Sequence, residues 1–261
     1  MKISIIGAGA MGGAIVEGLL KSQYVEAGNL CVSDASQQAV ERFAKSGVNI
    51  TTDNKAAAMD SDLVVVVVKP WLVEQVLGQI KEVLDYNRQQ LVVVAAGIKG
   101  EQLKQWMQKN DTLPNMFLAI PNIAIAQLAS MTFLVAVATE SQHTEQVKAM
   151  FDAMGKTIIT EEKLLGAGTT LASCGIAYAM RYIRAAAEGG VELGFKANDA
   201  KNIVMQTMKG AVELLEATGL HPEAAIDLVT TPGGVTIKGL NEMEHNGFTS
   251  SVIKGLKAGA K

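Results

Sequence analysis

A glycine motif near the start of the chain limits its possible folds more than any other feature. Residues 7–12 read Gly-Ala-Gly-Ala-Met-Gly, a G-x-G-x-x-G pattern. An isoleucine-rich apolar run at residues 2–6 precedes it, and apolar residues at helical spacing continue to residue 21. This arrangement predicts a buried strand that turns tightly into a helix, the opening of a βαβ unit. A turn with only a structural role is the alternative, but the βαβ context favours a dinucleotide-binding site.

The rest of the first half alternates between strand-like and helix-like segments. Five consecutive valines at 64–68 disfavour a helix and fit a strand that is buried on both faces of a parallel sheet. We predict strands at residues 2–6, 30–33, 63–68, 91–94, 115–120, 132–138 and 157–160. We predict helices at residues 11–21, 37–45, 72–83 and 102–108. Strands that alternate with helices build an α/β fold, here a Rossmann-type doubly wound sheet.

The second part of the chain has a different character. From residue 161 onward we predict no strand, only helices rich in alanine, methionine and leucine, at residues 164–193, 198–217, 222–229, 237–244 and 250–257. Asn198 is a typical helix N-cap residue, and Pro222 suits a first helical turn. We therefore expect a dinucleotide-binding domain at residues 1–160 and an all-helical domain at residues 161–261, to which the family resemblance described below assigns substrate binding and dimerisation.

Composition excludes several classes of function. The chain has 261 residues, 49% of them hydrophobic, and a net charge of −3. It lacks the basic excess that nucleic-acid binding requires. Its two cysteines are far apart, and no cluster of histidine, cysteine and aspartate has metal-ligand spacing. No uninterrupted run of about 18 apolar residues indicates a membrane span. We expect a cytoplasmic protein with no metal, no nucleic-acid partner and no membrane contact.

The expected cofactor is a nicotinamide dinucleotide, NADH or NADPH. In the glycine motif, Gly7 allows the tight turn, Gly9 lets the backbone approach a pyrophosphate, and Gly12 lets helix and strand pack closely. Asp34 follows the second predicted strand, where a carboxylate hydrogen-bonds the adenosine ribose and repels a 2′-phosphate. The nearest basic residue after it, Arg42, lies two helical turns further on. Asp34 therefore favours NADH, unless it only caps or flanks the next helix.

A second glycine-rich segment lies between two predicted helices. Residues 229–236 read Val-Thr-Thr-Pro-Gly-Gly-Val-Thr. Two glycines after a proline expose backbone N–H groups at the start of the next helix, and the hydroxyls of Thr231 and Thr236 lie at the same place. A carboxylate binds well to such a group of donors. On its own, the motif is equally consistent with an ordinary loop that carries a threonine cap.

This loop resembles the signature of pyrroline-5-carboxylate reductases, which have a Ser/Thr-Pro-Gly-Gly-x-Thr-Ile loop in a C-terminal helical domain. Further matches to the family follow in order along almost the whole chain: the glycine motif, Asn54, Val68-Lys69-Pro70, Ala95-Ala96-Gly97, Pro121-Asn122, Ala177-Tyr178 and His221-Pro222. The resemblance implies hydride transfer from NADPH or NADH to the cyclic imine Δ1-pyrroline-5-carboxylate, which gives L-proline in the last step of proline biosynthesis. It also implies a homodimer or a higher homo-oligomer.

The resemblance assigns roles to individual positions. By this resemblance, the cofactor-binding residues are Gly7, Ala8, Gly9, Ala10, Met11, Gly12, Asp34, Asn54, Val68, Lys69, Pro70, Ala96 and Gly97. The substrate-binding residues that it implies are Glu162, Thr231, Gly233, Gly234, Val235 and Thr236. An imine carbon becomes electrophilic when the nitrogen is protonated. Thr236, placed near that nitrogen, is the expected catalytic residue, because its hydroxyl orients the nitrogen or donates to it.

Two segments depart from the family pattern. Residues 121–124 read Pro-Asn-Ile-Ala where the family commonly has Pro-Asn-Thr-Pro. Residues 172–178 read Ala-Ser-Cys-Gly-Ile-Ala-Tyr where the family commonly has Ser-Gly-Ser-Gly-Pro-Ala-Tyr. The alternatives are therefore a reductase of another small imino or keto acid, a deazaflavin–NADP oxidoreductase, and a non-catalytic dinucleotide sensor. The intact Thr-Pro-Gly-Gly-Val-Thr loop speaks against the last two.

Overall fold

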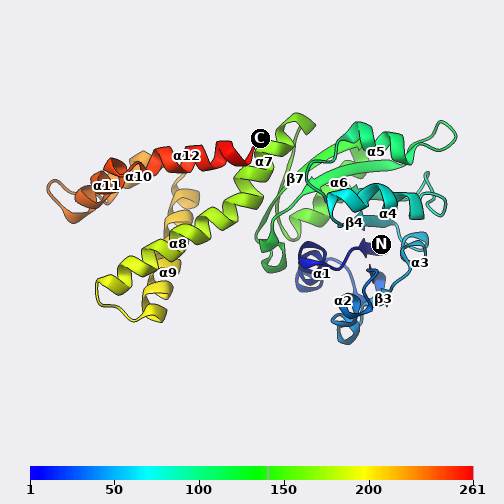
Figure 1. Cartoon of the computed structure of the whole chain (residues 1–261), viewed down its shortest axis with the longest axis horizontal. Coiled ribbons are helices and arrows are strands. Elements are labelled where there is room, and N and C mark those ends of the chain that lie inside the picture. Colours follow the sequence, from blue (N-terminus) through cyan, green and yellow to red (C-terminus); the bar gives the residue numbers. More distant parts are fainter. Residues whose placement is uncertain (140, 261) are drawn as a thin grey trace. The chain divides into compact units, whose positions relative to one another are not determined.

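A computed structural model describes residues 1–139 and 141–260 and divides the chain into two compact units, Met1–Ser173 and Cys174–Lys261 (Figure 1). The first unit is an α/β sheet domain, and the described part of the second contains only helices. The predicted fold class, a Rossmann-type doubly wound sheet followed by an all-helical C-terminal domain, is confirmed.

One eight-stranded sheet forms the centre of the first unit, with the strand order β3-β2-β1-β4-β5-β6-β7-β8. Neighbouring strands are parallel except β6 and β7, which are antiparallel. The strands are β1 (Ile3–Ile6), β2 (Leu30–Ser33), β3 (Asn49–Thr51), β4 (Leu63–Val66), β5 (Gln90–Val93), β6 (Asn115–Ile120), β7 (Ser130–Ala138) and β8 (Gly155–Ile159). The order reverses between β1 and β4. The carboxyl ends of these two strands therefore form the switch point at which doubly wound sheets bind ligands.

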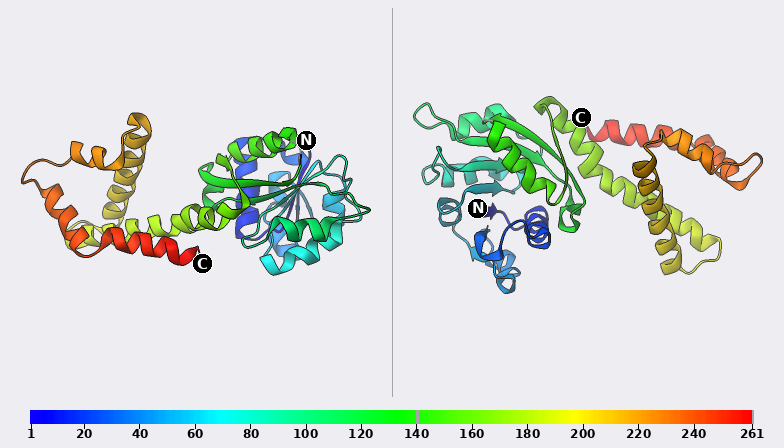
Figure 2. Two further views of the ribbon diagram at one scale, coloured as in Figure 1. Left: turned by 90° about the horizontal axis from the view of Figure 1, so that it is seen from above. Right: turned by 180° about the vertical axis from the view of Figure 1, so that it is seen from behind.

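Helices cover both faces of the sheet (Figure 2). They are α1 (Ala10–Ser22), α2 (Gln37–Glu41), α3 (Asn54–Met59), α4 (Val73–Ile80), α5 (Gly100–Met107), α6 (Ser141–Asp152) and the short α7 (Leu165–Gly168). Because side chains alternate along a strand, Ile5 and Val65 pack in one apolar layer with α1 and α6. Ile6 and Val66 pack in the other layer with α4 and α5. Each such buried side chain contributes about 1.5–3 kcal/mol, so the strands that carry the switch point are held from both sides.

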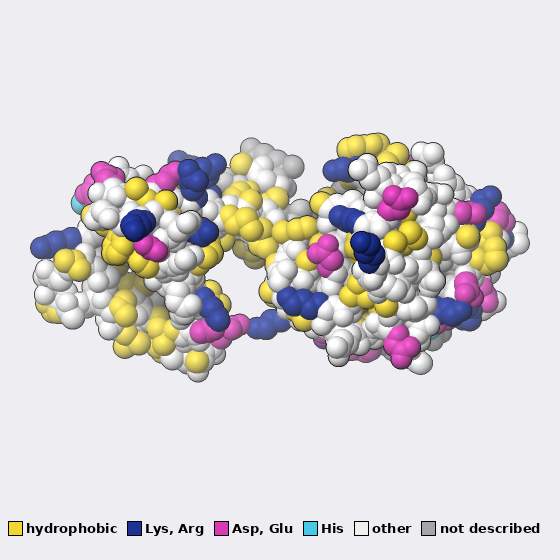
Figure 3. All heavy atoms as spheres, turned by 90° about the horizontal axis from the view of Figure 1, so that it is seen from below, with side chains coloured by type: hydrophobic (Ala, Val, Ile, Leu, Met, Phe, Trp, Pro, Cys, Tyr) yellow, Lys and Arg dark blue, Asp and Glu magenta, His cyan; other side chains and the backbone are white. Residues whose placement is uncertain are grey.

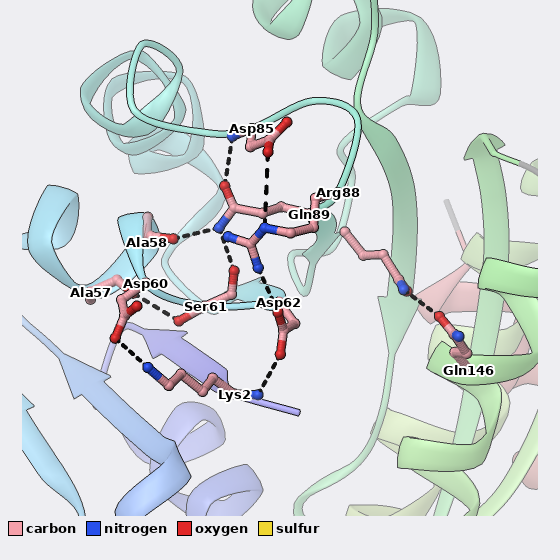
Figure 4. Close-up of polar contacts among 11 residues, drawn as sticks. Lys2, Ala57, Ala58, Asp60, Ser61, Asp62, Asp85, Arg88, Gln89 and Gln146 are labelled. Carbon is pink, nitrogen blue, oxygen red and sulfur yellow. Dashed lines mark hydrogen bonds and ion pairs between the residues drawn. The ribbon is translucent and has the colours of Figure 1, made fainter.

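A hydrogen-bond network closes the amino-terminal ends of the strands (Figure 4). Gln89, whose side chain is almost fully buried, lies directly before β5. Its Oε1 accepts the N–H of Asp85 at 2.7 Å. Its Nε2 donates to the carbonyl oxygens of Ala58 and Ser61 at 2.6 and 2.5 Å. A buried amide needs partners of this kind, and here they join the chain before β5 to the end of α3.

The structure adds one strand, β3, and two helices, α3 and α6, that we did not predict from the sequence. β3 has three residues, Asn-Ile-Thr, too few to show an alternation. In α6 the first half is polar, and the large buried side chains Val147, Met150 and Phe151 all lie near its end, too few to indicate a helix by their spacing. The helix predicted at residues 37–45 ends at Glu41, and a 3₁₀ turn follows.

The second unit consists of α8 (Gly175–Glu192), α9 (Ala197–Thr218), α10 (Pro222–Leu228), α11 (Val235–His245) and α12 (Phe248–Gly259). The helix predicted at 164–193 is not continuous, because a π-helical segment, Thr169–Cys174, separates α7 from α8. The prediction that Asn198 is an N-cap was also wrong. The N-cap of α9 is Lys196, and Asn198 lies inside the first turn.

Hydrophobic side chains gather on the surface of the helical unit (Figure 3). Large exposed side chains on α8, α9 and α12 include Tyr178, Met180, Val191, Ile203, Met205, Val212, Leu214, Phe248, Val252 and Ile253. Apolar surface of this extent marks a protein–protein interface. In the described parts of the chain, no helix combines the length and the apolar character needed to cross a membrane.

Candidate functional site

A groove of about 430 Å³ lies at the carboxyl ends of β1, β4 and β5. Four of its lining residues were not predicted: Val67, Leu72, Val94 and Ala95. Three of them directly follow β4 or β5, so their position after a valine-rich strand was the available signal. The remaining lining residues are all predicted cofactor residues: Gly7, Gly9, Ala10, Met11, Gly12, Asp34, Val68, Lys69, Pro70 and Ala96.

The glycine loop after β1 packs closely against neighbouring backbone at two positions, Gly7 and Gly12, where no side chain would fit. Gly7 has a φ of +107°, and a Cβ there would lie 2.1 Å from the carbonyl oxygen of Val67. A Cβ on Gly12 would lie 1.8 Å from the carbonyl oxygen of Gly7. Gly9 differs, because no atom lies within 4 Å of the position its Cβ would take. At Gly9 the backbone therefore borders open space in the groove.

The start of α1 offers an anion site on the same groove. Gly9 is the N-cap of this helix, and no side chain caps it. The N–H groups of the first turn, at Ala10 and Met11, have no intrahelical partner and form the positive end of the helix dipole. A pyrophosphate is the kind of group that such a helix start binds. The residues present therefore fit a dinucleotide.

Asp34 is anchored to the glycine loop. Its Oδ2 accepts the N–H of Ala8 at 2.7 Å, and its Oδ1 accepts the N–H of Ser36 at 2.9 Å. Ser36 is the N-cap of α2, although its side chain makes no capping hydrogen bond. Asp34 is thus neither a helix cap nor merely solvated. Each of its oxygens keeps a second lone pair for a further donor, and Asp34 lines the groove.

Asn54 is near the groove but is not among the residues that line it. It is the first residue of α3, and its Oδ1 accepts the hydroxyl of Ser33 at 2.7 Å. Its Nδ2 donates to Gln79 of α4 at 2.7 Å. Asn54 therefore ties the end of β2 to two helices. Ala8 likewise does not line the groove. Its backbone N–H holds the carboxylate of Asp34, which does.

A second pocket, also of about 430 Å³, shares Ala95 with the groove. The predicted residues Gly97 and Glu162 line it, together with Ile98, Lys99, Ile120, Lys163, Leu165, Gly166 and Thr169. The carboxylate of Glu162 lies at the first residue of α5, since a Cβ on Gly100 would be 2.6 Å from its Oε2. A negative charge is favoured at a helix N-terminus. Glu162 is therefore held beside the carboxyl end of β5.

The two segments that depart from the family pattern are in contact. The hydroxyl of Ser173 donates to the carbonyl oxygen of Pro121 at 2.7 Å. Next to Pro121, the side chain of Asn122 accepts the N–H of Ala124 at 3.0 Å and caps the 3₁₀ turn Ile123–Gln127. A substitution that moves the backbone of one segment would therefore also displace the other through this hydrogen bond.

In the helical unit, the loop before α11 forms a tight turn. The N–H of Gly234 donates to the carbonyl oxygen of Thr231 at 3.0 Å, and Gly233 has a φ of +72°. With Pro232 as the second residue, this is a type II turn. A Cβ on Gly234 would lie 2.5 Å from Oγ1 of Thr231, so the second glycine leaves room for that hydroxyl.

The helix that follows the turn begins with open donors. No side chain caps α11, so the N–H groups of Val235 and Thr236 have no intrahelical partner. Within the part of the chain that the structure describes, the hydroxyls of Thr231 and Thr236 have no hydrogen-bond partner either. The structure therefore brings the predicted loop residues together as one group of donors that suits a carboxylate.

Two further polar side chains of the described residues, His221 and Tyr86, lie outside both pockets. Among residues 1–139 and 141–260, no group of three His, Cys, Asp or Glu side chains could hold a metal ion. His221 is the N-cap of α10, where its Nδ1 accepts the N–H of Glu223 at 3.3 Å. Burial raises the pKa of Tyr86 to about 12, and Tyr86 lies in the segment before β5, outside both pockets.

Two family models match the chain. The one described as pyrroline-5-carboxylate reductase dimerisation matches residues 162–261. The one described as NADP oxidoreductase coenzyme F420-dependent matches residues 2–97. The second match is confined to the part of the sheet that carries the glycine loop.

Curated relatives match the whole chain. A pyrroline-5-carboxylate reductase from Arabidopsis thaliana is 34% identical, over 100% of this chain and 93% of its own length. Pyrroline-5-carboxylate reductase 2 from Dictyostelium discoideum is 33% identical, over 99% of this chain and 91% of its own length. For pyrroline-5-carboxylate reductase 1 of the same organism, 35% identical over 97% of this chain, the chain spans 48% of the relative's length.

Solved structures agree with these relatives. The 1-pyrroline-5-carboxylate reductase of Streptococcus pyogenes has a TM-score of 0.86 and 30% identity, over 100% of this chain and 96% of that one. The pyrroline carboxylate reductase of Plasmodium falciparum, with NADP bound, has a TM-score of 0.90 and 24% identity, over 100% and 95%, and shows the shared fold. The resemblance found in the sequence is confirmed: this chain belongs to the pyrroline-5-carboxylate reductase family, NAD(P)-dependent oxidoreductases that act on a carbon–nitrogen double bond and have a C-terminal dimerisation domain.

Proposed function

We propose that this chain reduces Δ1-pyrroline-5-carboxylate to L-proline, the last step of proline biosynthesis. The observation that carries the proposal is that one chain contains both a groove whose helix start suits a pyrophosphate and a loop whose donors suit a carboxylate. That loop also carries a threonine hydroxyl without a hydrogen-bond partner in the described chain. The relatives that span the whole chain are named for this reaction.

The groove at the switch point is the proposed cofactor site. The glycine loop and the start of α1 hold the pyrophosphate, Asp34 faces the adenosine ribose, and Lys69 and Pro70 border the nicotinamide side with Val68, Ala96 and Gly97. When bound, the nicotinamide supplies the hydride. Asn54 supports the ribose side through Ser33 rather than by lining the groove. The carboxylate of Asp34 is the reason to propose NADH as the preferred cofactor.

The loop before α11 is the proposed substrate site. The substrate carboxylate would accept hydrogen bonds from the open N–H groups of Val235 and Thr236 at the start of α11. The hydroxyl of Thr236 would donate to the imine nitrogen and pass its proton to it, which makes the ring carbon electrophilic, and would then regain a proton from water. Glu162 is proposed to act on the substrate from the second pocket.

The dimerisation match supports a homodimer or a higher homo-oligomer, assembled through the apolar surface of the helical unit. We further propose that the chain works in the cytoplasm. The domain boundary after residue 160 stays a prediction: the dimerisation match begins at residue 162, and the compact units divide after Ser173.

The proposed reaction is tested by following oxidation of NADH and NADPH in parallel with pyrroline-5-carboxylate. Thr236→Ala is expected to lower kcat/KM about 100-fold or more, since a positioned proton donor contributes at least that much. Thr207→Ala is the matched control, because Thr207 is exposed on α9 and bonds only its own helix at Ile203. NADH binding without turnover of this imine in the unsubstituted protein would contradict the proposal.

A second candidate is a reductase of another small imino or keto acid. The contact between Ser173 and Pro121 favours it, because the two altered segments meet there. A panel of cyclic imines and 2-keto acids, assayed with NADH, separates the two candidates. A higher kcat/KM for any other compound than for pyrroline-5-carboxylate would favour the second.

A further inference from the structure

Arg42 reaches the glycine loop although 30 or more residues separate the two in sequence. Its Nη2 donates to the carbonyl oxygen of Ala8 at 2.8 Å and lies 3.2 Å from that of Gly9. Arg42 is the residue directly after α2, and its side chain remains exposed overall. A cation from α2 thus lies on the loop that begins the proposed cofactor site.

Two neighbours hold the guanidinium in this position. It lies 4.5 Å from the centre of the ring of Phe43, which is buried in the core. Gly13 of α1 leaves the necessary space: a Cβ there would lie 1.7 Å from Nη2 of Arg42. The ring of Phe43 and the narrow space beside Gly13 both suit the planar guanidinium of arginine. They suit lysine less well, because its ammonium has no planar face.

Arg42 and Asp34 bind the two backbone polar groups of the same loop residue, Ala8. Asp34 accepts the N–H of Ala8 at 2.7 Å, and Arg42 donates to the carbonyl oxygen of Ala8 at 2.8 Å. In the described chain, Nε and Nη1 of Arg42 have no hydrogen-bond partner. A full positive charge with free N–H donors therefore lies on the same loop residue whose N–H binds Asp34, although Arg42 itself does not line the groove.

We propose that Arg42 is a second determinant of cofactor specificity and binds the 2′-phosphate of NADPH. This inference rests on the proposed function in one respect, the placing of the adenosine ribose at Asp34. A guanidinium forms short, charge-assisted hydrogen bonds to phosphate oxygens. Arg42 thereby offsets the repulsion between Asp34 and the 2′-phosphate, and the protein uses NADPH as well as NADH.

Calorimetry with two nucleotide fragments tests this without any turnover. Adenosine 2′,5′-bisphosphate carries the 2′-phosphate, and adenosine 5′-monophosphate lacks it. Arg42→Gln is expected to weaken bisphosphate binding about tenfold more than monophosphate binding, as loss of a charged hydrogen bond predicts. Gly13→Ala should shift the same ratio in the same direction, because it displaces the guanidinium while Arg42 remains.

Lys45→Gln is the matched control, since it removes one positive charge from the following exposed turn without touching the loop. It should leave the ratio of the two affinities unchanged. Equal weakening of both fragments by Arg42→Gln would mean that Arg42 only supports the loop, and it would overturn the proposal, as would no weakening of either. Monophosphate binding by a protein that reduces no imine would contradict the proposed reaction and leave this test intact.

Discussion

At their amino-terminal ends, the parallel strands of the α/β unit meet side chains that satisfy the backbone, whereas at their carboxyl ends they meet glycines and unpaired N–H groups. At the amino end, Gln89 binds three backbone groups, and Arg88 pairs with Asp62 at 2.5 Å. At the carboxyl end, α1 starts without a side-chain cap and Gly9 borders open space. The same strands thus end in a closed network on one side and an open site on the other.

This difference indicates that the amino ends of the strands contribute to stability and the carboxyl ends to ligand binding. A buried polar group that loses its partner costs about 1–3 kcal/mol, so the amino end contributes stability. The unpaired N–H groups at the carboxyl end do not add stability on their own, because they are free for a ligand. Substitutions at the two ends should therefore separate folding from cofactor binding.

The largest effect is expected at Gly7, where both stability and ligand binding should change. Gly7→Ala would place a methyl group 2.1 Å from the carbonyl oxygen of Val67 at a positive φ. Overpacking and backbone strain together should cost about 2–5 kcal/mol of unfolding free energy. Dinucleotide binding should be lost with the loop. Urea unfolding and NADH titration of the same preparation measure both effects.

Gly9→Ala is the matched variant, because its methyl group meets no protein atom within 4 Å. We expect stability within about 1 kcal/mol of the unsubstituted protein and a loss of NADH affinity of about tenfold or more, since the methyl group takes space that a pyrophosphate needs. If Gly9→Ala bound NADH normally, the groove would not hold the pyrophosphate at this position.

The opposite pattern is expected at the amino end. Gln89→Leu keeps the volume but leaves the carbonyl oxygens of Ala58 and Ser61 and the N–H of Asp85 without their partner. We expect a loss of about 2–4 kcal/mol of unfolding free energy. Since this residue is far from the groove, NADH affinity in the remaining folded protein should not change.

Gln105→Leu is the control for this variant, since Gln105 is an exposed residue of α5. It should change the unfolding free energy by less than about 0.5 kcal/mol. A Gln89→Leu protein as stable as the control would show that water replaces the lost hydrogen bonds, and that the amino end is less closed than the contacts indicate.

The sequence predicted the open end better than the closed one, for physical reasons. The glycine motif, Asp34 and the valine strand are local patterns, and each indicates its structure without knowledge of the rest. The contacts of Gln89 and the contact between Arg42 and Ala8 join segments that are distant in sequence. Neither contact produces a periodicity or a motif, so the fold must be known before they can be seen.

In the helical unit, the loop before α11 was predictable because Pro-Gly-Gly defines its own turn. The π-helical segment Thr169–Cys174 was not, since its residues also suit an α-helix. Asn198 shows the limit of capping rules: its type predicts a cap, yet α9 begins one residue earlier, at Ala197.

The smallest expected effect concerns Tyr86 at the closed end. Its hydroxyl donates to the carbonyl oxygen of Met107 at 2.6 Å, and burial, followed by the charge of Glu82, raises its pKa from 10.0 to about 12. Because the pKa is raised in the folded state, the neutral tyrosine stabilises the protein fully below pH 10, and this contribution is lost as the pH rises toward about 12. Tyr86→Phe should therefore flatten the fall in stability across that range, and should lower the late step of a tyrosinate absorbance titration. Burial also raises the pKa of Tyr24, so the measurement is the amplitude of the late step; if that amplitude did not fall in the variant, Tyr86 would not carry the shift.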